Sequence, residues 1–168
     1  MPPYFKFLSY ILFFVSINSH AAIEHDELVE LRFSQSSAVI QSEDNLAEHL
    51  NTLKALGSPL LHLSETGRKE FIDSIVWTDG GIGSFSALPL ELELNVTQAY
   101  QILQLFGLES VITSLKNLTI DSTLEFDVLD IYPENRCNIR GYHCVPPATC
   151  QKSLSDICIT CNCGMAEP

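Results

Sequence analysis

The cysteines of this 168-residue chain are confined to its end: all six lie between Cys137 and Cys163, and none precedes them. Residues 132–168 also have too few large apolar side chains for a core of their own. Small segments of this kind depend on crosslinks for stability. We therefore predict that residues 132–168 form a small disulfide-rich module. Its crosslinked residues are Cys137, Cys144, Cys150, Cys158, Cys161 and Cys163.

The spacing of the last cysteines limits how they can pair. A disulfide between Cys161 and Cys163 would bridge a single residue and strain the bond geometry. We therefore expect these two residues to reach back to different partners. The candidate partners are Cys137, Cys144 and Cys150.

Two other uses of the cysteines are considered. Cys158 and Cys161 form a C-x-x-C motif, which in other settings is a redox pair. Alternatively, Cys158, Cys161 and Cys163, with His143 or Cys144, could hold zinc or copper as thiolates. Thiols are scarce in an oxidising compartment, so the disulfide interpretation comes first and a metal-binding tail is an alternative.

The N-terminus has the pattern of a secretory signal peptide. Lys6 provides a positive charge, residues 7–17 are a strongly apolar stretch, and Ser19-His20-Ala21 places small residues at a cleavage site. The apolar stretch is shorter than the roughly 20 residues that span a bilayer. We predict that residues 1–21 are removed, that the mature chain has no membrane span, and that the protein is secreted or periplasmic.

Charge and composition divide the rest of the chain. Residues 22–131 contain most of the acidic residues, whereas residues 132–168 balance acids and bases and contain every cysteine. We predict an acidic domain over 22–131, able to fold alone, and a cysteine-rich tail over 132–168. The net charge of −12 argues against nucleic acid as a partner, because that binding depends on Lys and Arg.

The acidic domain contains three segments with helical patterns. Leucines recur at helical spacing between Asn45 and Leu56, with Gly57 as a stop. Asn95 and Gln98 form a capping-box pattern for a helix that ends at Gly107. A shorter helix is expected over 64–72.

Strands are expected where apolar and polar residues alternate. The alternating segments are 28–34, 88–94 and 118–128, and a hairpin is expected over 72–87 around Asp79-Gly80-Gly81. Together these elements predict an α+β fold: an antiparallel sheet with two main helices on one face, plus the small disulfide-rich C-terminal module.

No metalloprotease, nucleophile-elbow, phosphate-loop or dinucleotide motif occurs in the sequence, and we predict no cofactor. We favour a non-enzymatic protein that binds a protein or surface ligand through its tail. The candidate contact residues are Arg136, Arg140, Tyr142 and His143, because Arg and Tyr are common interface anchors.

The main alternative is a small extracytoplasmic hydrolase that uses carboxylates of the acidic domain. Paired carboxylates can carry out acid–base hydrolysis, and the predicted strands would place several on one face. These carboxylates are Glu91, Glu93, Asp121, Glu125 and Asp127. A solvated acidic strand face would give the same pattern.

Overall fold

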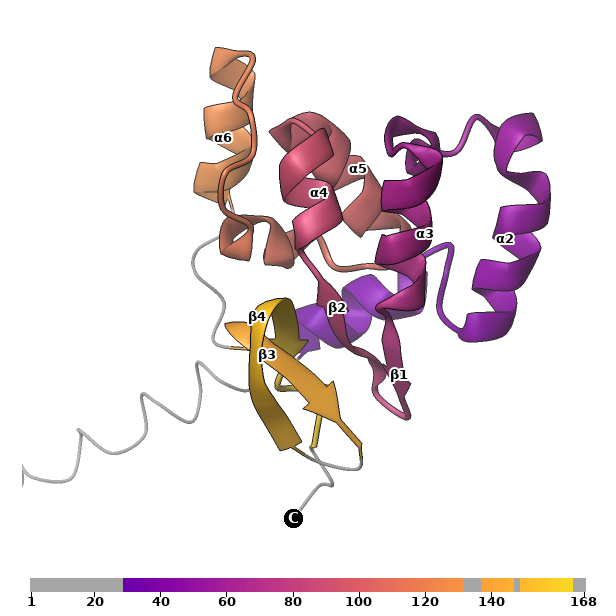
Figure 1. The fold of residues 1–168 in the computed structure, drawn as a ribbon, viewed down its shortest axis with the longest axis vertical. Coiled ribbons are helices and arrows are strands. Elements are labelled where there is room, and N and C mark those ends of the chain that lie inside the picture. Colours follow the sequence, from indigo (N-terminus) through magenta and orange to yellow (C-terminus); the bar gives the residue numbers. More distant parts are fainter. Residues whose placement is uncertain (1–28, 132–136, 147–148, 165–168) are drawn as a thin grey trace, which may run out of the picture.

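The computed structural model describes residues 29–131, 137–146 and 149–164 and has an α+β fold (Figure 1). Residues 29–37 are helical, and the other helices and strands follow in chain order. The helices are α2 (Glu43–Leu56), η1 (Pro59–His62), α3 (Glu65–Asp73), α4 (Leu88–Glu93), α5 (Val96–Leu105), η2 (Glu109–Ser114) and α6 (Thr123–Ile131). The strands are β1 (Val76–Thr78), β2 (Gly81–Ser86), β3 (Asn138–Val145) and β4 (Thr149–Ile159).

The four strands form one antiparallel sheet in the order β1-β2-β4-β3. The predicted hairpin over 72–87 is confirmed as β1 and β2, which meet at the Asp79-Gly80-Gly81 turn. Strand β4 pairs with β2 through Phe85 and Ile157 and pairs with β3 along most of its length. The cysteine-rich tail therefore supplies two of the strands of a sheet that the acidic segment begins.

The core lies where the sheet meets the helices. Phe71 of α3 makes edge-to-face contacts with Phe85 of β2 and Phe106 after α5, at ring-centroid distances of 5.6 and 5.8 Å. Ile157 and Ile159 of β4 are fully buried in the same cluster. Figure 1 shows α2 to α6 gathered on one side of the molecule and the β3–β4 hairpin at the other end.

Local capping signals fix two of the predicted helices. Asn95 and Gln98 form the expected capping box at the start of α5. Gly57, with φ of 61°, ends α2 in the left-handed conformation. The start of α2 differs from the prediction: Ser42, three residues before Asn45, is the cap, and its hydroxyl accepts a hydrogen bond from the Asn45 amide. The helix predicted over 64–72 is confirmed as α3.

Three of the predicted strands are wrong, because residues 29–37, 88–93 and 123–131 are helical. In a series of leucines spaced two residues apart, every second leucine is four residues from the last, and residues four apart share one face of a helix. In α4 that face carries Leu90, and Leu94 follows it into the core, while Leu92 is 74% exposed. Pro89 fits the first turn of this helix, where its missing N–H leaves no bond unmade.

All six cysteines are paired. The disulfides are Cys137–Cys161, Cys144–Cys163 and Cys150–Cys158. As expected from the spacing, Cys161 and Cys163 reach back to different partners. Within the described part of the chain, no helix is both long and apolar enough to cross a membrane.

Candidate functional site

The carboxylates considered for hydrolysis have structural partners. Glu91 of α4 is almost fully buried, and the guanidinium of Arg140 on β3 donates to both of its oxygens, one at 2.8 Å. The two residues lie 49 positions apart in the chain. The same carboxylate accepts a hydrogen bond from the backbone amide of Lys116. This bidentate pair joins the helical side of the molecule to the disulfide-rich hairpin.

Glu93 forms hydrogen bonds at the N-terminus of the neighbouring helix, α3. Its two oxygens accept hydrogen bonds from the backbone amide and the hydroxyl of Ser64, at 2.7 and 2.9 Å. Ser64 in turn caps α3 by accepting from the amide of Gly67. A negative charge at this position stabilises the start of a helix, where backbone N–H groups lack partners.

Glu125 is the most deeply buried of these carboxylates, with 2% of its surface exposed. It accepts hydrogen bonds from the backbone amides of Asp121, Thr97 and Ser122 and from the Thr97 hydroxyl. Burial acts to raise the pKa of Glu125, but these hydrogen bonds outweigh it and hold the pKa below the ordinary value for glutamate. The carboxylate therefore stays ionised and joins the first turn of α5 to the start of α6 and the two residues before it.

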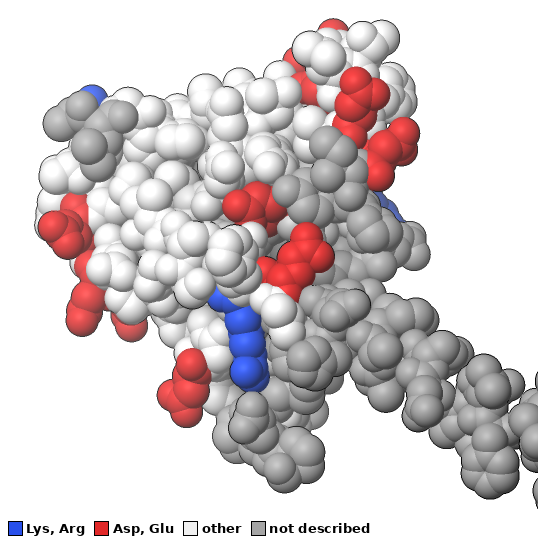
Figure 2. Space-filling view, turned by 180° about the vertical axis from the view of Figure 1, so that it is seen from behind, with Lys and Arg blue, Asp and Glu red and all other residues white. Residues whose placement is uncertain are grey.

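The predicted acidic strand faces do not exist. In α6 the expected sides are reversed: Glu125 lies inside, while Leu124 is 72% exposed and Phe126 is 55% exposed. Asp121 accepts a hydrogen bond from the side-chain amide of Asn95 at 2.8 Å. On the face shown in Figure 2, acidic side chains lie in separate groups around a broad area without charge. The strands that would have placed these carboxylates on one face are therefore absent from residues 88–93 and 123–131.

The described contact residues predicted in the tail lie on β3, an edge strand of the sheet. Arg140 and Tyr142 line a shallow hollow of about 340 Å³ on the β3–β4 hairpin. His143 pairs with Gln151 further along the hairpin, and Arg136 lies outside the described residues. The structure thus brings together two of the four predicted residues.

Lys152, Ser153 and Leu154 of β4 complete this hollow. Leu154 is 99% exposed, more than any other large apolar residue in the described part of the chain. Sequence reasoning missed Leu154, because a single leucine between two serines does not indicate whether its side chain faces the core or the solvent. Tyr142 also packs against the cluster of buried disulfides. We call Tyr142, Lys152 and Leu154, with Arg140 beside them, the hairpin surface.

The sulfur atoms of Cys144, Cys158 and Cys163 lie within 4.8 Å of one another. They belong to two adjacent disulfides, and disulfide sulfur lacks the thiolate charge that zinc and copper bind. Cys158 and Cys161 are bonded to different partners, so the alternative in which they form a redox pair does not hold. The alternative of a metal-binding tail would require these thiols to be reduced first.

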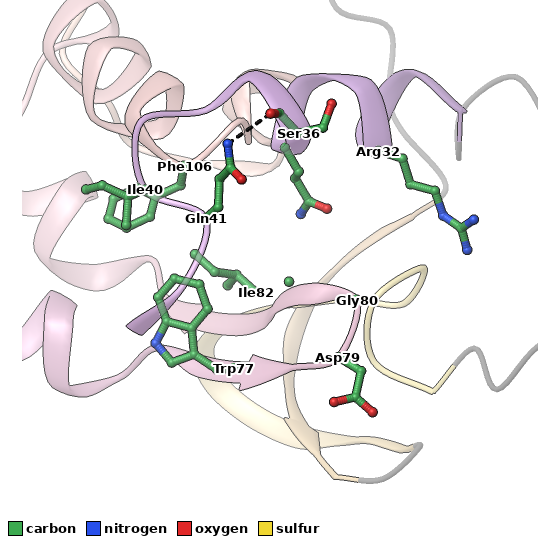
Figure 3. A pocket seen from close by; sticks show the side chains of 11 residues that line it. Arg32, Ser36, Ile40, Gln41, Trp77, Asp79, Gly80, Ile82 and Phe106 are labelled. Carbon is green, nitrogen blue, oxygen red and sulfur yellow. Dashed lines mark hydrogen bonds between the residues drawn. The ribbon is translucent and has the colours of Figure 1, made fainter. Parts of the chain in front are cut away.

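A cleft of about 380 Å³ lies between helix 29–37 and the β1–β2 hairpin (Figure 3). Gly107 holds the helix close to the core: its φ is +65°, and a Cβ there would lie 2.5 Å from the backbone carbonyl of Ser34. Trp77, the only tryptophan of the chain, forms part of the wall. Sequence analysis missed this cleft because it assigned residues 28–34 to a strand.

The chain matches no protein-family model, no curated protein and no solved structure. Its function is therefore argued from its own residues.

Proposed function

We propose that this is a secreted or periplasmic, non-enzymatic protein that binds a partner protein through the hairpin surface. The exposed position of Leu154, beside Tyr142, carries the proposal. Binding is favoured when a partner covers a fully exposed apolar side chain, because removing that surface from water lowers the free energy of the complex. Aromatic residues next to such a position are typical of the centres of protein interfaces.

The crosslinks support this role because they fix the surface in advance. Cys150–Cys158 crosslinks the two ends of the region that contains Lys152 and Leu154, and Cys144–Cys163 anchors β3. Binding by a rigid surface requires less ordering of loops and side chains than binding by a mobile one. Disulfides of this kind also fit an oxidising compartment.

Charge indicates what kind of partner fits. The chain is acidic overall, yet the hollow has Arg140 and Lys152 in its wall and no acidic side chain among its lining residues. Arg140 is already matched by Glu91, so Lys152 supplies the local positive charge. We infer a partner whose contact surface combines an apolar group with a carboxylate.

The test compares Leu154→Asp with Leu92→Asp in the full mature chain. Leu92 is the matched control because it is also an exposed leucine, at 74%, but lies on α4. Each variant is immobilised and exposed to the extracytoplasmic fraction of the source cells, and bound proteins are quantified by mass spectrometry. We expect a partner bound by the wild type to be reduced at least tenfold by Leu154→Asp and retained by Leu92→Asp. Equal retention by both variants would refute the proposal.

Arg140→Ala is unsuited to this test. Removing Arg140 leaves Glu91 buried without its counter-ion, and breaking a buried pair in this way costs about 3–5 kcal/mol. Loss of binding would then report on folding. Lys152→Glu avoids this problem, and we expect it to weaken the same partner selectively.

A further inference from the structure

We propose a second binding site in the cleft between helix 29–37 and the β1–β2 hairpin, specific for a di- or tripeptide with free ends and an apolar side chain. The cleft shares no residue with the hairpin surface. Its volume of about 380 Å³ lies within the roughly 300–1,000 Å³ typical of small-ligand sites. The two sites can therefore be tested separately.

One end of the cleft is apolar. Ile40 and Phe106 are buried on one wall, and Ile82 and the half-buried ring of Trp77 lie side by side on the hairpin that forms the other wall (Figure 3). An aliphatic or aromatic side chain placed here would lose water on several sides. A polyhydroxylated ligand such as a sugar would instead lose hydrogen bonds at this end.

Gln35 lines the cleft and supplies a donor that has no partner among the described residues. This donor is the buried Nε2 atom of its side chain. A buried donor without a partner destabilises the fold, so a ligand that brings an acceptor to this atom is favoured. The Gln35 amide lies against Gly81, where a Cβ would be 3.2 Å away, and the absence of a side chain at Gly81 leaves room for it.

Gln41 supplies the complementary acceptor. Its Nε2 donates to the backbone carbonyls of Ser36 and Ala38, both at 2.9 Å. These bonds fix the amide and leave its oxygen to accept a hydrogen bond. One donor on Gln35 and one acceptor on Gln41 match the C=O and N–H of a peptide group.

The other end of the cleft carries charges of opposite sign on its two walls. Arg32 extends from helix 29–37 and Asp79 from the hairpin turn, both away from the apolar end (Figure 3). A ligand with one positive and one negative end suits this arrangement better than a simple anion or cation does. A short peptide with free ends combines these charges with the amide and the apolar side chain.

Trp77 provides the measurement, because the only tryptophan of the chain lies in the cleft. The mature protein is titrated with Leu-Phe while its tryptophan fluorescence is recorded. Parallel titrations use free phenylalanine, N-acetyl-Leu-Phe-amide and glucose. We expect saturable binding of Leu-Phe, at least tenfold tighter than that of phenylalanine or the blocked peptide, and none of glucose. Equal binding of phenylalanine, preference for glucose or the absence of a saturable change would overturn the peptide assignment.

The variant Gln35→Leu tests the role of the amide. It removes the unpartnered donor, so we expect a thermal midpoint equal to or above that of the wild type, together with Leu-Phe affinity at least tenfold weaker. Gln104→Leu, on the exposed side of α5 and outside the cleft, is the matched control and should bind as the wild type does. Wild-type affinity in Gln35→Leu would contradict the site. Leu154→Asp should leave this affinity unchanged, so failure of either proposal is recognised independently of the other.

Discussion

Glu125 illustrates how much a single buried side chain can decide in this protein. Its carboxylate, on α6, accepts hydrogen bonds from Thr97 in the first turn of α5 and from Asp121 just before α6. Sequence patterning placed Glu125 on a solvated face and its apolar neighbours inside, and the structure has the opposite arrangement. Alternation of polar and apolar residues cannot reveal this, because the donors that satisfy Glu125 come mostly from the backbone.

The lowered pKa of Glu125 predicts how stability changes with pH. Because the folded protein holds this proton less tightly than the unfolded chain, Glu125 stabilises the fold above the ordinary glutamate pKa of about 4.3. That contribution is lost as the pH falls through the lower, folded value. Glu125→Gln should therefore reduce the free energy of unfolding at neutral pH by about 1–3 kcal/mol. The difference from the wild type should shrink on acidification.

Chemical denaturation at a series of pH values measures this difference. Asp127→Asn is the control, because Asp127 lies on the same helix but is exposed. It should change the free energy of unfolding little at any pH. A deficit in Glu125→Gln that does not vary with pH would contradict the ionised, hydrogen-bonded state.

Among the elements, helix 29–37 depends on one glycine for its position. Gly107 adopts a left-handed conformation, and a Cβ there would meet the backbone of Ser34 and Gln35 at 2.5–2.6 Å. Backbone atoms cannot move aside as the end of a side chain can. The close approach at Gly107 therefore sets one wall of the cleft that contains Trp77.

Gly107→Ala should combine two penalties. The left-handed conformation costs a residue with a side chain about 1–2 kcal/mol, and the steric conflict with helix 29–37 adds roughly 1–3 kcal/mol. Gly57→Ala isolates the first penalty, since Gly57 has φ of +61° but no atom within 4 Å of an added Cβ. Thermal or urea unfolding should show a clearly larger loss for Gly107→Ala. Equal losses would mean that the helix does not press against this glycine.

At the scale of the whole molecule, the tail and the acidic segment share one sheet and one core. Strand β4 pairs with β2, and the main core contains Cys137, Ile157 and Ile159 from the tail. Composition suggested that residues 22–131 fold alone. The pairing of β4 with β2 leads us to the opposite expectation, because truncation would remove β4 from the open edge of β2 and uncover Phe85.

A chain that ends at Asp130 should therefore lose cooperative thermal unfolding. Circular dichroism during heating measures this directly, with the full mature chain as the reference. A single cooperative transition in the shortened chain would restore the compositional boundary as a true domain boundary.

The sequence by itself determined features that depend on neighbouring residues. The capping box of Asn95 and Gln98, the stop at Gly57 and the Asp79-Gly80-Gly81 turn follow from local backbone chemistry. The spacing of Cys161 and Cys163 likewise excluded a bond between them. Each of these features involves groups only a few positions apart, so no knowledge of the rest of the fold was needed.

Tertiary structure alone decided which face of each segment is buried and which distant groups meet. The leucines of residues 88–94 fit a strand or a helix by pattern, and the structure has a helix there that packs against α3 and buries Leu90. Arg140 could be read as an interface anchor until the fold placed it against Glu91. The cleft around Trp77 likewise exists only because Gly107 lets helix 29–37 approach the core. Burial and long-range pairing depend on the whole chain at once, and that is why local patterns could not specify them.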